Sequence, residues 1–322
     1  MVIPPRVLLL DVAGPLEVLR RANLEQDAIR FKVAYAGPAT TSASSIGLAL
    51  AGLSPLPEAL AGDTLVVIPG SATVTFEDKG SDDGEHAAAE DAIVRWLGRA
   101  IRPGIRLASI CSGALLAGRA GLLNGEDCTT HHETTAELKR VAPRARVLEN
   151  RLYVESGQRL TSAGVTAGID LMLHVVSGEA GAQAALAVAR HLVVYLRRAG
   201  ADPQLSPWLE GRNHIHPVVH RAQDAIAQDP AASWPVARLA KIAGTSSRNL
   251  SRLFSEHAGM GVAEYANRLR IARARELITG TRLNIEHVAG RAGFASARQF
   301  RRAWGRMNDT PPSHLRSSSE RP

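Results

Sequence analysis

The stretch RLASICSGALLAGRAGLL, which runs from Arg106 to Leu123, contains the side chain best suited to chemistry, Cys111. A short apolar run ends at this cysteine, and an alanine- and leucine-rich segment of helical character follows it. At a strand-to-helix turn, the helix N-terminus favours a thiolate and its free backbone N–H groups can hold an oxyanion. Cys111 is therefore a candidate nucleophile, and the rest of the sequence has to indicate whether this turn catalyses a reaction or binds a ligand.

The elements that would position Cys111 alternate along the first two hundred residues. Strand-like runs lie at 6–14, 30–37, 63–70, 106–111 and 146–164, the last with a turn at Ser156–Gly157. Helical patterns lie at 85–101 and 165–176, and a longer alanine-rich pattern lies at 180–196. Repeated strand–helix–strand order predicts an α/β fold, with a mainly parallel sheet that is flanked by helices on both faces.

The composition excludes several classes of protein. The chain has 322 residues, enough for two domains, and it is 45% hydrophobic and 21% charged. No apolar run approaches the roughly 20 residues of a membrane helix, and the run Val7–Leu10 is too short for a signal peptide. Cys111 and Cys128 do not form a CxxC pair, which argues against a disulfide framework and a cysteine-based zinc site. We expect a cytoplasmic protein that needs no metal and no cofactor.

Positive charge is concentrated at the C-terminal end of the chain. Residues 212–322 carry 18 Lys and Arg against 8 Asp and Glu, whereas residues 1–211 carry 20 against 23. Nearly all cations of the C-terminal part are arginines, which bind phosphate and guanine through paired hydrogen bonds. A segment rich in Gly, Pro and Asn separates the two regions. We predict an α/β domain at 1–199, a linker at 200–216, an all-α domain at 217–316 and a disordered tail at 317–322.

The last hundred residues contain a near-duplication. The segment LAKIAGTSSRNLSRLFSEHAGMG aligns with HVAGRAGFASARQFRRAWGRMNDTP. Gly244 corresponds to Gly293, 49 residues later, and Phe254 corresponds to Trp304, 50 residues later, so the second copy has one extra residue in its turn. Each copy has the pattern helix, glycine turn, helix, with an apolar face opposite a face of arginine and amide side chains. Such a face suits the DNA major groove, and a helical bundle with a basic surface is the alternative.

Residues 217–316 resemble the AraC/XylS DNA-binding domain over both copies and the connecting helix, including the segments GFASARQFRRAW and TPPSHLR. The resemblance implies that the helices near Ser246–His257 and Ser296–Met307 are recognition helices. Two such units enter successive major-groove segments roughly 34 Å apart, so one protomer would read an asymmetric site. The candidate DNA-contacting residues are Ser247, Arg248, Asn249, Arg252, Ser296, Arg298, Gln299, Arg301 and Arg302. For Arg252 and Arg301, contacts to phosphates and contacts to bases both stay open.

The N-terminal part resembles the DJ-1/PfpI-like, class I glutamine amidotransferase-like domain in the form fused to AraC-type regulators. Four segments carry this resemblance, in this order: LLLDVAGPLEVLRRAN, DTLVVIPG, ASICSGALLAGRAGLLNGEDCTTHH and TSAGVTAGIDL. The resemblance implies a flavodoxin-like sandwich. In it, Glu17 resembles the acidic residue that faces the cysteine, and His131 resembles a histidine that lies near the cysteine in some members. The catalytic candidates are Cys111, His131 and Glu17. The implied ligand pocket consists of Glu17, Cys111, Ser112, His131 and His132.

Four other polar side chains have local explanations. Asp170 lies near the start of a predicted helix, where capping is its expected role. His214, His216 and His220 suggest a metal cluster at first, but they have no neighbouring Cys or acidic residue. We therefore expect these histidines to be structural or exposed to solvent.

The N-terminus departs from the family pattern. Relatives begin with a complete strand before the LLLDVAGP block, whereas here only Met1–Ile3 precede Pro4–Pro5. That strand is central in the sheet, and its loss would expose backbone groups of its neighbours. We therefore expect the natural chain to begin upstream of Met1, and the intact mass of the native protein tests this expectation.

The favoured interpretation is a transcriptional regulator without enzymatic activity. Its α/β domain would sense a small-molecule effector, and its helical domain would bind double-stranded promoter DNA. We expect a homodimer that does not bind membranes and that has RNA polymerase as a further partner. A cysteine-dependent hydrolase or lyase with a DNA-binding tail is the alternative from another class. An architectural DNA binder without a ligand is the third, and it predicts weak sequence preference and steep salt dependence.

Overall fold

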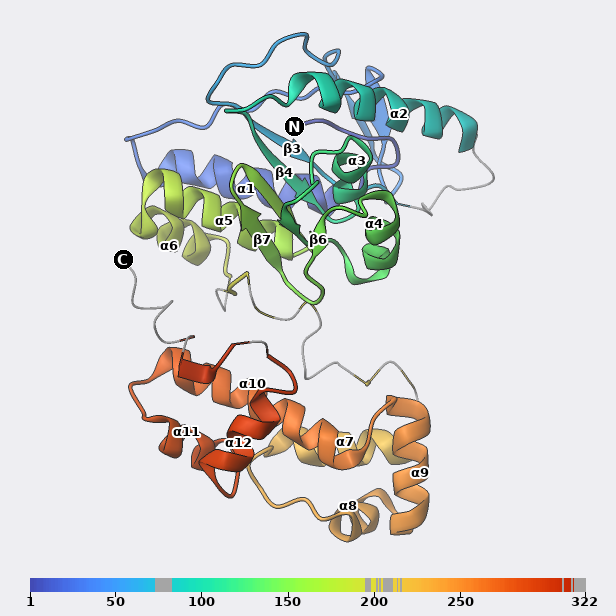
Figure 1. Cartoon of the computed structure of the whole chain (residues 1–322), viewed down its shortest axis with the longest axis vertical. Helices are drawn as coiled ribbons and strands as arrows, with labels where there is room; N and C mark the ends of the chain where they lie inside the picture. The colour runs from blue at the N-terminus through green and yellow to red at the C-terminus, as the bar shows by residue number, and fades with distance from the viewer. Residues whose placement is uncertain are drawn as a thin grey trace. The chain divides into compact units, whose positions relative to one another are not determined.

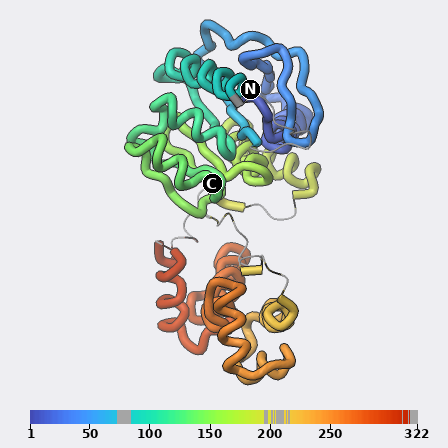
Figure 2. The backbone as a smooth tube through the Cα atoms, turned by 90° about the vertical axis from the view of Figure 1, so that its right-hand side faces the viewer, coloured from blue at the N-terminus to red at the C-terminus, as the bar shows by residue number. Residues whose placement is uncertain are grey.

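The computed structural model describes residues 1–72, 83–194, 198–200, 202, 204, 211–212, 214, 216–308, 310–313 and 315. The chain forms two compact units, Met1–Gln204 and Leu205–Pro322 (Figure 1, Figure 2). The predicted tail at 317–322 and most of the predicted linker at 200–216 lie outside the described residues. Within the described ranges, no helix combines the length and the apolar character that crossing a membrane requires.

A four-stranded sheet forms the centre of the first unit. Its strand order is β3 (Leu65–Ile68), β4 (Arg106–Ile110), β8 (Arg159–Ser162), β7 (Tyr153–Ser156). β3, β4 and β8 run parallel, and β7 pairs antiparallel with β8. Alternate residues of β3 pack into different cores: Val66 and Ile68 into one, and Val67 into the other. Burial of both faces is typical of parallel strands that are covered by helices.

Helices cover both faces of this sheet (Figure 1). α1 (Leu9–Glu25), α5 (Ala167–Ala180) and α6 (Ala182–His191) pack together on one face, and α2 (Asp83–Ala100), α3 (Gly113–Arg119) and α4 (Thr135–Val141) lie on the other. Shorter elements are the hairpin β1 (Thr41–Ala43) with β2 (Ala49–Ala51), the pair β5 (Asp127–Cys128) with β6 (Arg146–Val147), and the 3₁₀ turn His132–Thr134. The predicted α/β fold, with a mainly parallel sheet flanked by helices, is confirmed.

Two segments that were predicted as strands are not strands. The run 6–14 enters α1 at Leu9, because its inward-facing residues recur at helical spacing: Asp11, Pro15 and Val18 are all buried. The run 30–37 forms only isolated bridges at Ala36. Apolar composition alone did not distinguish these segments from buried strands.

The N-terminal residues take a position beside β3. The backbone N–H of Val2 donates to Val67 O at 2.9 Å, and that of Ile3 donates to Ala36 O at 2.8 Å. Val2 and Ile3 are both buried. Val2 therefore supplies a backbone donor to β3, and Ile3 supplies one to Ala36.

Helices make up the second unit in its described part. They are α7 (Pro217–Gln228), α8 (Val236–Ala243), α9 (Ser247–Ala258), α10 (Val262–Gly280), α11 (Ile285–Arg291) and α12 (Ala297–Trp304), orange to red in Figure 2. α8 with α9, and α11 with α12, are the two helix-turn-helix pairs. The predicted all-α domain with two such units is confirmed.

α10 connects the two helix-turn-helix pairs as one continuous helix. Its residues up to Leu269 pack into a core with α7, α8 and α9, while Ile271, Ala274 and Ile278 pack into a second core with α11 and α12. An aromatic pair occupies each core, Phe254 with Tyr265 and Phe300 with Trp304, both with ring centroids 5.5 Å apart. Because one helix contributes to both cores, the two pairs are held at a defined spacing.

Gly293 is the position in the second unit where a side chain is least tolerated. Its φ is +91°, and a Cβ added there would lie 2.4 Å from Ala231 Cα. We expect Gly293→Ala to lower the free energy of unfolding by about 2–5 kcal/mol, as the sum of backbone strain and overpacking. Urea unfolding followed by far-UV circular dichroism measures this change.

Gly290→Ala is the matched control. Gly290 lies inside α11, and an added Cβ would meet no atom within 4 Å. Alanine is preferred in a helix, so this variant should be more stable than the parent by about 0.5–1 kcal/mol. Equal losses of stability in the two variants would contradict the packing described at Gly293.

Candidate functional site

Cys111 lies at a sharp turn between β4 and α3. Its φ is +55°, a left-handed conformation that is uncommon for a residue with a side chain. Two glycines leave room for it: a Cβ on Gly164 would lie 2.1 Å from Cys111 Cβ, and a Cβ on Gly70 would lie 2.9 Å from the same atom. The cysteine is 5% exposed. The predicted strand-to-helix turn is therefore present, and neighbouring backbone encloses its side chain.

Asp11 is the acidic partner of Cys111. Its carboxylate is fully buried, and it accepts hydrogen bonds from the backbone N–H of Gly70 at 3.1 Å and of Val165 at 2.6 Å. The Cys111 thiol donates to the same carboxylate. Burial raises the pKa of Asp11, and the bonds from Val165, Gly70 and Cys111 counteract part of that rise.

The environment of Cys111 favours the thiol over the thiolate. Burial, followed by the negative charge of Asp11, raises the pKa of Cys111 to about 12, although a bond from the Ser112 backbone N–H lowers it in part. A nucleophilic cysteine needs a lowered pKa or an adjacent base. The turn therefore has the shape of a nucleophile site and the electrostatics of a structural thiol.

Ser112, His131 and His132 lie around the Cys111 turn. Ser112 Oγ accepts from Ser71 N at 2.9 Å. The His131 and His132 rings lie 4.2 Å apart, and burial, followed by the charge of His132, lowers the pKa of His131. Among the described residues, no hydrogen bond connects His131 with Cys111. The structure therefore brings these residues near one turn without forming a Cys–His pair.

Thr130 links the Cys111 turn to the end of the first unit. Its hydroxyl donates to Cys111 O at 2.8 Å, and Thr130 is fully buried. The Gln204 side-chain N–H donates to Thr130 O at 2.7 Å and to Arg151 O at 3.0 Å. Gln204 is the last residue of the first unit. Sequence analysis missed both residues: Thr130 lies inside the segment that ends in CTTHH but has no obvious chemical role there, and Gln204 belongs to no recognisable motif.

Glu17 does not face Cys111, and this part of the predicted site is corrected. Glu17 pairs with Arg20 at 2.7 Å, and its side chain is 51% exposed. It follows Asp11 by six residues, which is about 240° around the helix axis, so the two carboxylates point to different sides of α1. The residue that the prediction should have named is Asp11, whose signal is an acidic residue inside the apolar run LLLDVAGP.

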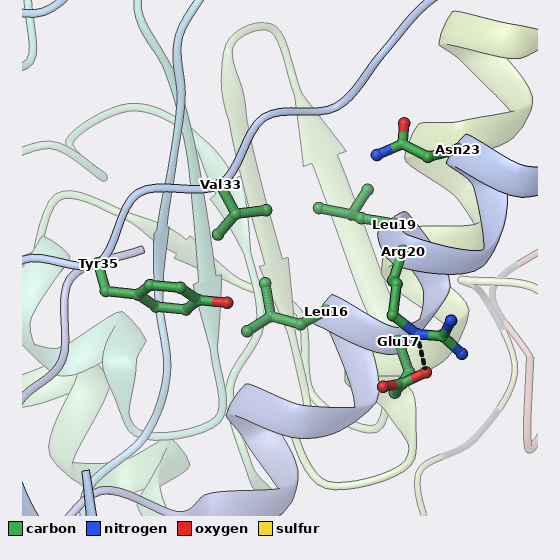
Figure 3. A pocket seen from close by; sticks show the side chains of 7 residues that line it. All are labelled: Leu16, Glu17, Leu19, Arg20, Asn23, Val33 and Tyr35. Carbon is green, nitrogen blue, oxygen red and sulfur yellow. Dashed lines mark hydrogen bonds and ion pairs between the residues drawn. The ribbon is translucent and has the colours of Figure 1, made fainter. Parts of the chain in front are cut away.

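Glu17 lines a separate hollow of about 250 Å³ on the outer side of α1 (Figure 3). Leucine side chains of α1 and the side chains of Val33 and Tyr35 face one another across it, and the Glu17–Arg20 ion pair lies beside them. The lining residues are Leu16, Glu17, Leu19, Arg20, Asn23, Val33 and Tyr35. The hollow includes none of the other residues predicted for the ligand pocket.

Asp170 does not cap its helix, contrary to expectation. It is the fourth residue of α5, and its buried carboxylate accepts from Arg198 Nε at 3.0 Å and from Arg198 Nη2 at 2.5 Å. Burial raises the pKa of Asp170, and the bonds to Arg198 counteract this. The ion pair fastens the segment after α6 to α5.

Four histidines cluster at the start of the second unit. The rings of His214 and His220 lie 4.6 Å apart, and those of His216 and His257 lie 4.5 Å apart. His214 Nδ1 accepts from the backbone N–H of His216 at 3.2 Å, and its carbonyl oxygen bonds to the His220 ring. In the described part of the chain, no group of three or more His, Cys, Asp or Glu is arranged to hold a metal ion. The cluster attaches His214 and His216 to α7 and α9.

The two predicted recognition helices begin in the same way. Ser246 Oγ accepts from Asn249 N, and Ser296 Oγ accepts from Gln299 N, each at 3.2 Å. These bonds are N-caps, which fix the first turn of α9 and of α12. The exposed faces of both helices carry arginines, and their buried faces carry Leu250 and Phe300.

Comparison with known proteins identifies both units. A family model described as the DJ-1/PfpI family matches residues 1–178, and one described as a helix-turn-helix domain matches residues 239–318. The chain is 30% identical to the HTH-type transcriptional regulator GlxA of Rhizobium meliloti, over 97% of this chain and 93% of that protein. It is 28% identical to the HTH-type transcriptional regulator CdhR of Pseudomonas aeruginosa, over 97% and 89%.

A further relative is matched over less of its length. The chain is 30% identical to the HTH-type transcriptional regulator GbdR of Pseudomonas aeruginosa over 68% of this chain, but the match spans only 59% of that protein. Both resemblances stated from the sequence are confirmed by these matches.

The high pKa of Cys111 predicts an unreactive thiol. At about pH 8, we expect alkylation of Cys111 in the native protein to be slower than in the unfolded chain by about three orders of magnitude, because the thiolate fraction falls by that factor. Alkylation of Cys128 should be slower by about two orders of magnitude, since burial raises its pKa to about 11. Peptide mass mapping after timed iodoacetamide treatment, with urea-unfolded protein as the control, measures the modification of each cysteine. Rapid modification of Cys111 alone would contradict this description.

The histidine cluster predicts acid sensitivity of residues 211–216. Burial, followed by the charges of His220, His257 and His216, lowers the pKa of His214. The unfolded imidazole therefore takes up protons first, and the stability that this contact contributes is present above about pH 6.5 and lost as the pH falls further. Hydrogen exchange of residues 211–216, corrected for the intrinsic rate at each pH, should rise below about pH 6.

His214→Asn tests which group titrates. Asn Oδ1 can accept the His216 N–H as His214 Nδ1 does, but it does not protonate, so exchange should stay slow at both pH values. His191→Asn, at the end of α6 in the other unit, is the matched control. Equal acid sensitivity in the His214 variant and the parent would show that other groups are responsible.

Proposed function

From its membership of the HTH-type transcriptional regulators that join a DJ-1/PfpI domain to an AraC-type helix-turn-helix domain, we propose that this chain regulates transcription. It binds its promoters through α9 and α12. The observation that supports this most is the repeated layout of the two helices. Each has a serine N-cap, an arginine at the second helical position and an amide at the third. Each also presents arginines to solvent, which suits a phosphate backbone and base edges.

The first unit is proposed to sense an effector rather than to turn over a substrate. Its one candidate nucleophile, Cys111, is buried, and burial raises the pKa of the Cys111 thiol. Solvent reaches the same turn at Ser112, His131 and His132, which are our candidates for effector contacts. Glu17 is excluded from this set because it lies on another side of α1. The shape of the turn would suit the hydrolase or lyase alternative, but the buried thiol with its raised pKa disfavours it.

Effector binding is proposed to act through Thr130 and Gln204. Thr130 bonds to the carbonyl of Cys111, and Gln204 bonds to the carbonyl of Thr130. A ligand that moves the Cys111 turn therefore moves the residue from which the chain continues to the second unit. Such coupling requires the effector to bind one arrangement of this contact more tightly than the other.

The assembly and its surroundings complete the proposal. The regulator acts in the cytoplasm as a homodimer, binds double-stranded promoter DNA and reaches RNA polymerase there.

Among the candidate DNA contacts, Ser296 and Gln299 have roles in the first turn of α12, since Ser296 caps the helix and Gln299 Oε1 accepts from Ala295 N at 3.0 Å. Ser247, with Ser296, is assigned to phosphates.

Fluorescence anisotropy on DNA upstream of its own gene and neighbouring operons tests the proposal. We expect binding that is tight, prefers particular sequences and weakens with salt. Arg298→Ala/Arg302→Ala removes two arginines from α12 and should weaken binding to the preferred DNA by about 30-fold, if each contact contributes about 1 kcal/mol.

Arg140→Ala is the control, because it also removes an exposed arginine. Arg140 lies on α4 in the first unit with a side chain 73% exposed, so its loss should leave DNA affinity unchanged. Salt-sensitive binding that is equal for all sequences would instead identify an architectural DNA binder. Absence of DNA binding by the parent would refute the proposed function.

A further inference from the structure

The arginines of the two recognition helices differ in whether they have partners within the protein. Arg252 Nη1 contacts Glu256 at 2.7 Å, and its Nη2 donates to Asn249 at 3.1 Å. Arg301 pairs with Glu286 at 3.4 Å. Arg248, Arg298 and Arg302 are exposed and, among the described residues, have no side-chain hydrogen bond or ion pair, and of these only Arg248 and Arg298 lie in the first turn of their helices. Their guanidinium groups are therefore available without breaking an existing contact.

Arg248 and Arg298 occupy equivalent positions. Each is the second residue of its helix, two residues after the capping serine, and the two are 50 residues apart in the chain. The cap bonds of Ser246 and Ser296 have the same donor position and the same length. Both arginines therefore leave the first turn in the same direction relative to their own helix, at the end that a recognition helix turns toward base edges.

The neighbouring amides are less free to read bases. Asn249 donates to Thr245 Oγ1 at 2.8 Å and accepts from Arg252, so both ends of its amide are used. Gln299 Oε1 accepts from Ala295 N. Reading an adenine requires both ends of an amide, whereas a free guanidinium matches O6 and N7 of a guanine. The local bonds therefore favour the two arginines over the two amides as the base-reading residues.

We propose that Arg248 and Arg298 each read one guanine through its O6 and N7, so that the target contains two guanines about one helical turn, roughly 10 base pairs, apart. This inference rests on the proposed function and adds which bases the two helices recognise. Because α10 belongs to both cores, the distance between the two arginines is a property of one protomer. Arg252, which is already paired, acts on phosphate and does not select a base.

The test uses the full chain and a duplex that contains the preferred site, with 7-deazaguanine placed at one guanine at a time. This base lacks N7 and keeps O6, so it weakens the contact without changing the sequence. For the parent, we expect each of two replacements, about one turn apart, to weaken binding by about 5-fold, the lower end of the range for a bidentate contact, because the bond to O6 is kept. In Arg248→Ala, one replacement should have no further effect, while the other keeps its full effect. Arg298→Ala should show the reverse.

Two further variants keep the test decisive. Arg248→Lys retains the charge without the bidentate geometry, so it should bind all DNA more tightly than Arg248→Ala but should not restore the response to 7-deazaguanine. Arg252→Ala should weaken binding to every sequence alike and leave both responses intact. Circular dichroism and the thermal midpoint confirm that the variants are folded.

The outcomes separate this inference from the proposed function. Sequence-preferring binding that both arginine variants weaken without a change in the response to 7-deazaguanine would overturn the inference and leave the regulator intact. A preferred site without two guanines one turn apart would overturn it also. Failure of the parent to prefer any DNA would refute the proposed function itself.

Discussion

The buried carboxylate of Asp11 is the contact on which the first unit depends. It joins the first turn of α1 to Gly70 after β3, to Val165 after β8 and to Cys111 after β4. A buried carboxylate is stable only when donors surround it, and each backbone N–H left without its acceptor would cost about 1–3 kcal/mol. One side chain therefore holds the ends of three parallel strands to the helix that packs on the sheet.

The same contact determines what the cysteine can do. The turn with φ of +55° and the glycines around it resemble the support of a nucleophile, but the negative charge of Asp11 opposes formation of a second one on sulfur. The Cys111 carbonyl, rather than the thiol, links the turn to the rest of the unit. It accepts from Thr130, and Thr130 O accepts from Gln204 at the end of the unit. In the proposed function, this turn therefore connects the candidate effector contacts to Gln204, the last residue of the first unit.

The order of strands and helices, the Cys111 turn and the repeated helices were predictable from the sequence, because periodicity and the 50-residue offset are properties of the chain alone. The partner of Cys111 was not predictable, since it depends on where α1 begins. The family resemblance alone predicted Glu17, and the run 6–14 was predicted as a strand; the structure instead has a helix that starts at Leu9, which turns Asp11 inward and Glu17 outward. The free arginines also required the structure. The ion pair of Arg252 with Glu256, four residues later, follows from helical spacing. The bond that the Ala295 N–H donates to Gln299 Oε1 instead depends on the turn that precedes α12.

The most direct measurement is selection of binding sites from random duplex DNA by the full chain, followed by sequencing. Two recognition helices held by one continuous α10 predict enriched sites with two conserved blocks about one helical turn apart, each read by one helix. Enrichment of a single block, or of no sequence at all, would contradict the account of a regulator that reads DNA with both α9 and α12.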